Sequence, residues 1–316
     1  MGRSELSGMS TTSPRASLVW RPGTAWELRA AWGHYYQYPS FEALQGDGYF
    51  LDLRGIKNAR LRPEHAEHFV AGVAYTGSRG WKLSLDLYDK PLEDILASSK
   101  EEETILVLDE LDQAYPYVRE RRTFLPENSR RGYARGAQVV LTLLEGTNRP
   151  YYGMLAYSYG EARTRDDEGW QWEDHDQRHS VLLTGGYRFS PHFELSGTWH
   201  YATGFPTTPV RNVIRVVEDV DGDGVYDSAA GDTFTYQRDE DHATINSRRL
   251  PAYHRLDLRL EYAPAPGRLT WSYYLDIINV YARANVEGYS YNADFTRKEP
   301  SEGLPFLPSV GVRVRF

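Results

Sequence analysis

The sequence predicts an all-β fold, an antiparallel transmembrane β-barrel with about eleven long strands. Three observations carry this prediction. Apolar and polar residues alternate over several segments, as they do in a strand with one face in lipid. Most of these segments reach the ~9–11 residues that a membrane-spanning strand needs. Tight turns alternate with polar loops of roughly 14 to 50 residues, which is typical of barrels with short turns at one end and long loops at the other.

The predicted strands follow one another in hairpins. They are, approximately, Ala16–Arg21, Trp26–Gln37, His65–Thr76, Trp81–Leu92, Gly132–Leu144, Tyr151–Arg163, Arg178–Phe189, His192–Thr203, Ala252–Tyr262, Arg268–Tyr281 and Ser309–Phe316. Proline or glycine marks the tight turns, as at Arg21-Pro22-Gly23 and Ser190-Pro191, because these residues favour turn geometry. A helix would need apolar residues at every third and fourth position, and the chain shows no convincing segment of that kind.

The alternation is clearest in Arg255–Tyr262, where every even position is apolar and every odd position is charged. We expect the apolar side chains of such strands to face lipid and the polar ones to face a wet interior. On that interior face, Arg255, Arg259, Arg313 and Arg315 are predicted to pair with carboxylates such as Asp257 and Glu261, since a polar barrel interior is the norm. Attraction of an anionic ligand is the alternative role for these arginines.

The chain ends in an alternating segment that an aromatic residue closes. Four of its side chains would face lipid: Val310, Val312, Val314 and Phe316. Bacterial outer-membrane β-barrels usually finish in this way, so we expect Phe316 to act as the barrel-assembly signal. The alternative is an edge strand of a soluble sheet.

Composition supports the barrel and excludes several other classes. The 24 Tyr, 11 Phe and 8 Trp are enough for aromatic girdles at two membrane interfaces. The absence of cysteine excludes disulfides, thiolate nucleophiles and cysteine-based zinc sites. The net charge of −8 argues against nucleic acid as a partner.

The organisation of the chain predicts a fragment. Residues 1–15 are expected to be a disordered or truncated strand region, and residues 16–316 the C-terminal part of an outer-membrane β-barrel. No signal peptide is recognisable at the N-terminus. Bacterial barrels have even strand numbers, so both ends of the chain lie on the periplasmic side. If the last of about eleven strands ends on that side, the first begins on the outside, and the strands cannot close into a barrel of this kind. We therefore expect the N-terminal part of the barrel to be missing.

Six sequence motifs relate the chain to a known protein family. They are Trp32–Pro39, Leu61–His68, Asp176–His179, Thr203–Pro206, Arg249–Asp257 and Asp276–Tyr281 with Asn285. In this order they resemble the C-terminal half of a TonB-dependent outer-membrane receptor. The resemblance implies the second half of a 22-stranded barrel, with the plug domain of such receptors absent from these residues.

The resemblance also implies a location and partners. The chain would lie in the bacterial outer membrane, in contact with its lipid, and would need the missing barrel half and plug. The complete receptor would work with an inner-membrane energy-coupling protein and take up an external nutrient, such as a siderophore, cobalamin or an oligosaccharide. The alternative is a non-transporting outer-membrane barrel, either an adhesin or an assembly scaffold.

Aromatic residues in the predicted loops are candidate ligand contacts. They are Trp170, Trp172, Tyr49, Phe205 and Tyr289. Packing between neighbouring loops is the alternative role for these side chains. No catalytic residue is predicted, because the chain has no nucleophile elbow and no phosphate-binding glycine loop before a helix. We expect a protein that is not an enzyme and requires no cofactor.

One acidic loop matches part of a calcium-binding pattern. The oxygen ligands at its odd positions would be Asp219, Asp221, Asp223, the Val225 carbonyl and Asp227, with a glycine at the sixth position. The twelfth position is Ala230 in place of the usual glutamate, so the pattern is incomplete. A structural Ca²⁺ in an external loop and a solvated acidic turn are the two interpretations.

Overall fold

A computed structural model shows one large antiparallel sheet. It describes residues 2–3, 10–40, 61–144, 146, 149–220, 222–229, 231–239, 242–264 and 270–315. Of the predicted site residues, Tyr49, Asp221 and Phe316 lie outside the described residues.

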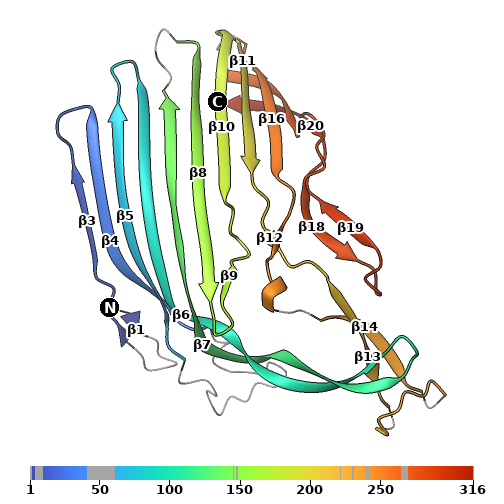
Figure 1. Cartoon of the computed structure of the whole chain (residues 1–316). Helices are drawn as coiled ribbons and strands as arrows, with labels where there is room; N and C mark the ends of the chain where they lie inside the picture. Colours follow the sequence, from blue (N-terminus) through green and yellow to red (C-terminus); the bar gives the residue numbers. More distant parts are fainter. Residues whose placement is uncertain are drawn as a thin grey trace.

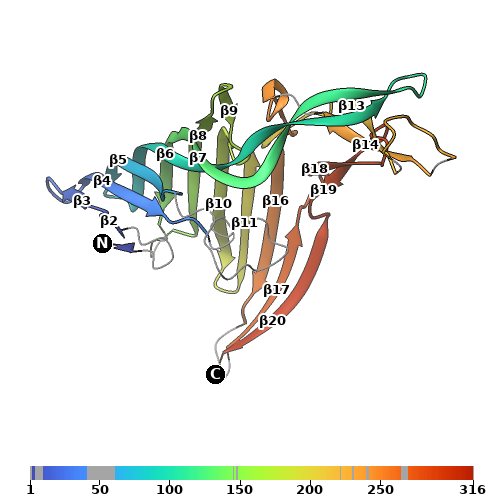
Figure 2. The ribbon, with the colours of Figure 1, turned by 90° about the horizontal axis from the view of Figure 1, so that it is seen from below.

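Eleven strands form the main path of this sheet, and each pairs with its neighbours along the chain. They are β3 (Arg15–Trp20), β4 (Trp26–Gln37), β5 (Glu64–Thr76), β6 (Trp81–Leu108), β7 (Ala114–Leu143), β8 (Tyr151–Arg165), β10 (His179–Ser190), β11 (Phe193–Ala202), β16 (Tyr253–Tyr262), β17 (Thr270–Ile278) and β20 (Leu307–Arg315). Their number and order confirm the predicted meander. The sheet is bent into an open trough (Figures 1 and 2). Short connections join strands at one end, here called the turn end, and long connections join them at the other, the loop end.

The sequence prediction was wrong about the connection between β6 and β7. These strands have 28 and 30 residues and continue through most of the segment predicted to be a loop. Their extensions form a two-stranded ribbon that bends away from the sheet at the loop end (Figures 1 and 2). Ion pairs cross it, such as Arg119 with Glu103 at 3.1 Å and Lys100 with Glu120 at 3.7 Å, although Glu102 and Glu120 also lie opposite each other. Cross-strand pairing therefore stabilises a segment whose polarity suggested a loop.

Short strands structure the other long connections. They are β9 (Trp170–Trp172) beside β8, the pair β12 (Pro206–Thr207) and β15 (Arg248–Arg249), the pair β13 (Asn212–Glu218) and β14 (Thr233–Asp239), and the pair β18 (Val286–Tyr291) and β19 (Lys298–Glu302). A 3₁₀ turn, η1, spans His242–Thr244. β13 also pairs with β6, where Arg215 lies opposite Leu108, so the ribbon is part of a larger projecting sheet.

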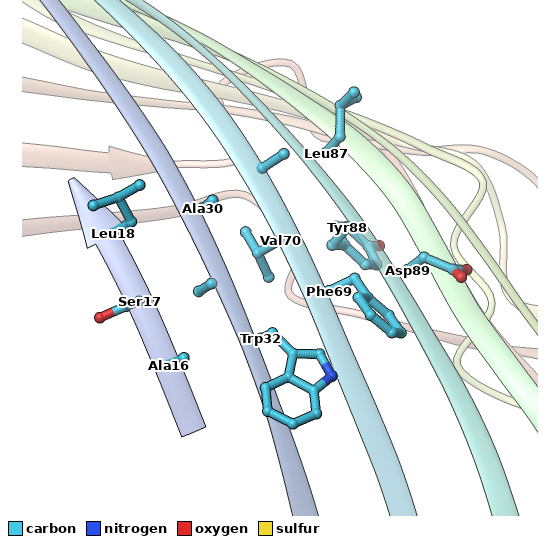
Figure 3. A pocket seen from close by; sticks show the side chains of 12 residues that line it. Ala16, Ser17, Leu18, Ala30, Trp32, Phe69, Val70, Leu87, Tyr88 and Asp89 are labelled. Carbon is cyan, nitrogen blue, oxygen red and sulfur yellow. The ribbon is translucent and has the colours of Figure 1, made fainter. Parts of the chain in front are cut away.

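The two faces of the main sheet differ in chemistry. One, here called the apolar face, carries side chains such as Leu183 and Val310, which are 49% and 81% exposed. It has a shallow hollow of about 630 Å³, in which Ala30 and Ala71 lie between Leu18 and Leu87 (Figure 3). This much exposed apolar surface would be unusual for a monomer in water.

The opposite, polar face carries ion pairs. Arg255 pairs with Asp257 at 2.9 Å, as predicted. Arg259 pairs with Asp276 at 2.7 Å, because Asp276 lies directly opposite it on β17. The polar face therefore has the balanced charges of a barrel interior.

Aromatic residues form two belts on the apolar face. The belt at the turn end contains Trp20, Trp26, Tyr75, Trp81, Tyr151, Tyr187, Phe189, Phe193, Tyr262, Trp271 and Tyr273; the belt at the loop end contains Trp32, Phe69, Tyr157, Tyr159, Trp199, Tyr201 and Tyr281. On β10 the two belts are about 26 Å apart along the strand, from His179 to Tyr187. At a strand tilt of ~40° this is about 20 Å along the membrane normal, which is close to the ~25 Å height of the apolar band of a membrane barrel. Within the described part of the chain, no helix is long and apolar enough to cross a membrane.

Candidate functional site

A buried carboxylate holds the loop end together. The side chain of Asp176 is fully buried, accepts a hydrogen bond from the backbone N–H of Ala162 at 2.7 Å, and pairs with Arg178 at 3.3 Å and with Arg249. Arg249 also donates to the carbonyl of Asp176 at 2.7 Å and to that of Gly204 at 3.2 Å. A buried charge needs such partners, so this centre fixes three loop segments relative to one another.

Beside this centre, the ends of β10 and β11 are joined through the backbone. Thr203 donates its N–H to the carbonyl of His179 at 2.9 Å, and His179 donates its N–H to Oγ1 of Thr203 at 3.0 Å. Gly204 lies so close to Leu250 that a Cβ at position 204 would overlap the Leu250 carbonyl. Leu250 in turn donates its N–H to the carbonyl of Phe205 at 2.9 Å.

Two asparagines complete the loop end. Asn285 pairs with the backbone of His254 through both ends of its amide, at 3.0 and 3.1 Å. Asn279 is fully buried and donates to the carbonyls of Arg283 and Leu304 at 2.9 and 3.0 Å. Four of the sequence motifs therefore meet at one place, because their polar residues bond to one another across the strand ends.

A cavity of about 440 Å³ opens on the polar face at this place. Its lining comes from the ends of β10, β11, β16 and β18: Gln177, His200, Thr203, Gly204, Phe205, Leu250, Pro251, Tyr253, Val286 and Glu287. A concave site with mostly apolar and aromatic walls and a few polar groups is the usual form of a ligand pocket. We therefore take this cavity as the candidate ligand site.

The polar groups of the cavity are held in place by neighbouring side chains. Nε2 of His200 lies 3.3 Å from Oγ of Ser180, and the imidazole ring lies 5.4 Å from the ring of Tyr253. Phe205 and Leu250 provide apolar surface, and Glu287 provides a carboxylate. These side chains offer ring stacking, apolar contact and hydrogen bonds to a ligand. Among these lining residues there is no nucleophile paired with a base for covalent catalysis.

A second anchor holds the loop that carries β9. The carboxylate of Asp166 lies 3.0 Å from Nε2 of His242 in η1 and 3.5 Å from Nη2 of Arg130. Burial would raise the pKa of Asp166, but His242, Arg130 and Lys100 outweigh that effect, so the pKa lies below its usual 3.8. The charged carboxylate therefore ties β7, the loop after β8 and η1 together.

The predicted ligand contacts are not gathered at one site. Phe205 lines the cavity. Trp172 lies on the opposite face, with the guanidinium carbons of Arg163 and Arg178 at 4.1 and 4.4 Å from its ring centre, and Trp170 lies two positions away on the same strand. Tyr289 packs under Nζ of Lys298 at 3.5 Å on the β18–β19 hairpin. The ligand role of these residues stays a prediction.

The acidic loop caps its own backbone. Asp219 accepts hydrogen bonds from the N–H groups of Gly222 and Gly224 at 2.7 and 2.9 Å, and Asp223 accepts one from Val225 at 2.8 Å. Asp227 similarly accepts one from Ala229 at 2.8 Å. Among the described residues, no three acidic or histidine side chains converge to hold a metal ion. These contacts fit a solvated acidic turn.

Sequence reasoning missed most of the cavity. Gln177, His200, Leu250, Tyr253 and Glu287 were not among the predicted site residues, although most lie in or beside the motifs. The polar position of His200 in an alternating strand was the available signal for that residue. The position of Glu287 depends on how the β18–β19 hairpin folds back, which no local pattern specifies.

Comparison with known protein families gives the same family that the sequence motifs indicate. A family model described as "TonB dependent receptor-like, beta-barrel" matches residues 3–283. No curated protein sequence matches the chain.

Several solved structures are similar to the chain. The ferric-catecholate import receptor Fiu of E. coli is 13% identical over 95% of this chain and 34% of its own, with a TM-score of 0.54. The FrpB iron transporter of Neisseria meningitidis is 13% identical over 95% and 38%, with a TM-score of 0.55. The ferripyoverdine receptor of Pseudomonas aeruginosa is 12% identical over 95% and 32%, with a TM-score of 0.53. At this identity the likeness shows the fold, and the chain spans about a third of the length of these proteins.

Proposed function

We infer that this chain, which belongs to the TonB-dependent receptor-like β-barrel family, forms part of the wall of an energy-coupled outer-membrane receptor that takes up an external nutrient. The cavity around Phe205 is the observation that carries the proposal. It lies at the loop end and on the polar face, where a ligand from outside would first meet the barrel interior.

The first ligands to test are ferric siderophores. Fiu and the ferripyoverdine receptor are described as receptors for ferric complexes, and FrpB as an iron transporter. The aromatic and apolar walls of the cavity suit the ring-bearing and aliphatic parts of such complexes. Cobalamin and oligosaccharides remain alternatives within the same proposal. In the complete receptor, a plug domain and an inner-membrane energy-coupling protein would drive release into the periplasm.

Ligand binding by outer membranes that contain the chain tests this proposal. Radiolabelled ferric siderophores should bind to these membranes and be displaced by an excess of the unlabelled complex. Phe205→Ala should weaken binding, whereas a substitution of Phe189 in the turn-end belt should not. Binding that is the same with and without the chain, for ferric siderophores, cobalamin and oligosaccharides alike, would contradict a receptor function.

A non-transporting adhesin or scaffold is the second candidate. The β6–β7 ribbon favours it, because it projects from the sheet and exposes Leu111, Tyr115 and Val118. Deletion of the ribbon tip, residues 109–113, should abolish surface attachment in that case and leave nutrient binding intact. We propose no enzymatic activity for either candidate, and a hydrolase assay on refolded protein tests that statement.

We retain a structural Ca²⁺ in the acidic loop as a proposal. Its support is the sequence spacing of Asp219, Asp221, Asp223 and Asp227. Calorimetric titration should detect calcium binding that Asp219→Asn with Asp223→Asn removes. Absence of binding heat in the folded protein would identify the loop as an acidic turn.

A further inference from the structure

Three strands place cationic and aromatic side chains in rows at the loop end. In the register of β7, β8 and β9, one row contains Arg131, Arg165 and Trp170, and the next contains Tyr133, Arg163 and Trp172. In a third row, nearer the sheet centre, Arg135 lies between Asp89 of β6 and Glu161 of β8. Side chains two positions apart share a face of a strand, so all three rows point the same way. We call them the cationic rows.

The cationic rows lie on the apolar face. Below Arg135 and Glu161 on the same strands come Ala137 and Tyr159, which belongs to the loop-end belt. The next rows are purely apolar or aromatic: Val139, Tyr157 and Val181, then Leu141, Leu155 and Leu183. The face therefore changes from apolar to aromatic to cationic along one continuous surface.

Most of the arginines in these rows lack an acidic partner. In the described part of the chain, no carboxylate lies within 4.0 Å of Arg131, Arg163 or Arg165. Glu161 is shared by Arg135 at 3.4 Å and Arg178 at 3.8 Å. The chain carries a net charge of −8, so unpaired positive charge at one place is a local feature and does not follow from composition.

Aromatic rings hold these guanidiniums in position. Arg163 lies 4.1 Å from the ring centre of Trp172, and Arg135 lies 4.4 Å from that of Tyr133. Nε of Arg163 is buried and has no hydrogen-bond partner among the described residues. A guanidinium stacked on a ring can still donate from its terminal N–H groups, which fit the oxygens of a phosphate, whereas the buried Nε of Arg163 is not open to one.

The two inner rows lie near the height of lipid headgroups, and the outermost row lies beyond it. Successive rows are about 6.6 Å apart along the strands, or about 5 Å along the membrane normal at a strand tilt of ~40°. The row of Arg135 is thus about 5 Å, that of Arg163 about 10 Å and that of Arg165 about 15 Å beyond Tyr159. The headgroup layer is about 6 Å thick on each side of the hydrocarbon, and an arginine side chain reaches across the remaining gap.

We propose that the cationic rows bind the phosphate groups of an anionic lipid in the leaflet at the loop end. The proposal rests on the membrane-embedded barrel of the proposed function. Charge complementarity and continuity with the lipid-facing band select a lipid headgroup as the occupant. On β5 and β6 the same face carries Glu67, Asp89 and Glu93, and Asp89 lies directly opposite Arg135, so the site is confined to the two outer rows on β7–β9, which carry Arg131, Arg163 and Arg165.

Lipid binding by the full chain, folded in a neutral detergent, tests the proposal by native mass spectrometry. The probes are phosphatidic acid, phosphatidylcholine and inorganic phosphate. The test variant is Arg163→Gln with Arg165→Gln, and the matched control is Arg313→Gln with Arg315→Gln, which removes equal charge from the polar face. Arg163→Lys with Arg165→Lys keeps the charge, and far-ultraviolet circular dichroism checks that each variant folds.

Phosphatidic acid should bind more tightly than phosphatidylcholine, and the test variant should weaken its binding roughly 10- to 30-fold. The control and the lysine variant should retain most of the binding. Equal loss in the control, no preference for phosphatidic acid, or full competition by inorganic phosphate would overturn the proposal. Nutrient binding measured on the same variants separates the two proposals, because the cationic rows and the cavity lie on opposite faces.

Discussion

Asp176 and Arg249 are 73 residues apart in the sequence and form an ion pair at the loop end, in which the carboxylate is buried and the guanidinium is partly exposed. Arg249 bonds to both the carboxylate and the carbonyl of Asp176, and also reaches Gly204. Through this pair, the segment before β10 is tied to the turns that follow β11 and precede β16. The candidate ligand cavity lies against these segments, so its shape depends on the pair.

Loss of this pair should loosen the cavity. Asp176→Asn removes the buried charge that the partly exposed guanidiniums of Arg178 and Arg249 pair with, and should cost about 1.5–3 kcal/mol, as loss of a hydrogen bond to a charged group does. Hydrogen exchange should rise at residues 176–179, 203–206 and 249–253. The control is Arg21→Gln, because Arg21 and Glu27 form an exposed pair, and exposed pairs contribute little to stability. Equal effects of the two substitutions would show that Asp176 has no special role.

Phe205 should contribute directly to ligand affinity. Phe205→Ala removes the aromatic wall of the cavity and should raise the Kd for a bound nutrient about 5- to 30-fold, as loss of an interface anchor worth ~1–2 kcal/mol does. Phe189→Ala removes an equal ring at the turn end and should leave the Kd unchanged. Fluorescence titration measures both. An unchanged Kd for Phe205→Ala would place the ligand elsewhere.

The anchor of the β9 loop should depend on pH. The pKa of Asp166 is lowered in the folded chain, so its contribution to stability is fully present above the unfolded value of about 3.8 and is lost as the pH falls through the folded pKa. Hydrogen exchange of residues 242–244 should therefore increase at acidic pH. Asp166→Asn should remove that dependence. If the variant keeps the same pH profile, another group controls the loop.

A charged substitution should reduce stability by very different amounts at two neighbouring positions on β10. Leu183 lies on the apolar face and Leu182 on the polar face. Leu183→Arg should destabilise the chain in lipid vesicles by about 2–4 kcal/mol, the cost of an arginine near the bilayer centre. Leu182→Arg should cost far less, since its side chain points away from lipid. Urea unfolding in vesicles measures both values, and similar costs would contradict the assignment of the faces.

Local patterns predicted the membrane part of the fold and failed beyond it. β4 and β16 were predicted to within a residue, because alternation is specific when one face meets lipid. The β6–β7 ribbon was missed, because it is held by backbone pairing and ion pairs between two strands and not by an alternation within one. The cavity depends on contacts such as Asp176 with Arg249. The sequence motifs contain these residues, but only the strand topology shows that they lie together.

A single-cysteine scan along β10 tests the central claim most directly, because the chain has no native cysteine to interfere. Spin labels from Ser180 to Tyr187 in lipid vesicles should show a period of two. Labels at odd positions should be relaxed by oxygen, which concentrates in lipid, and labels at even positions by a water-soluble nickel complex. Equal access of the nickel complex to both sets would show that the apolar face does not meet a membrane, and would contradict a receptor barrel.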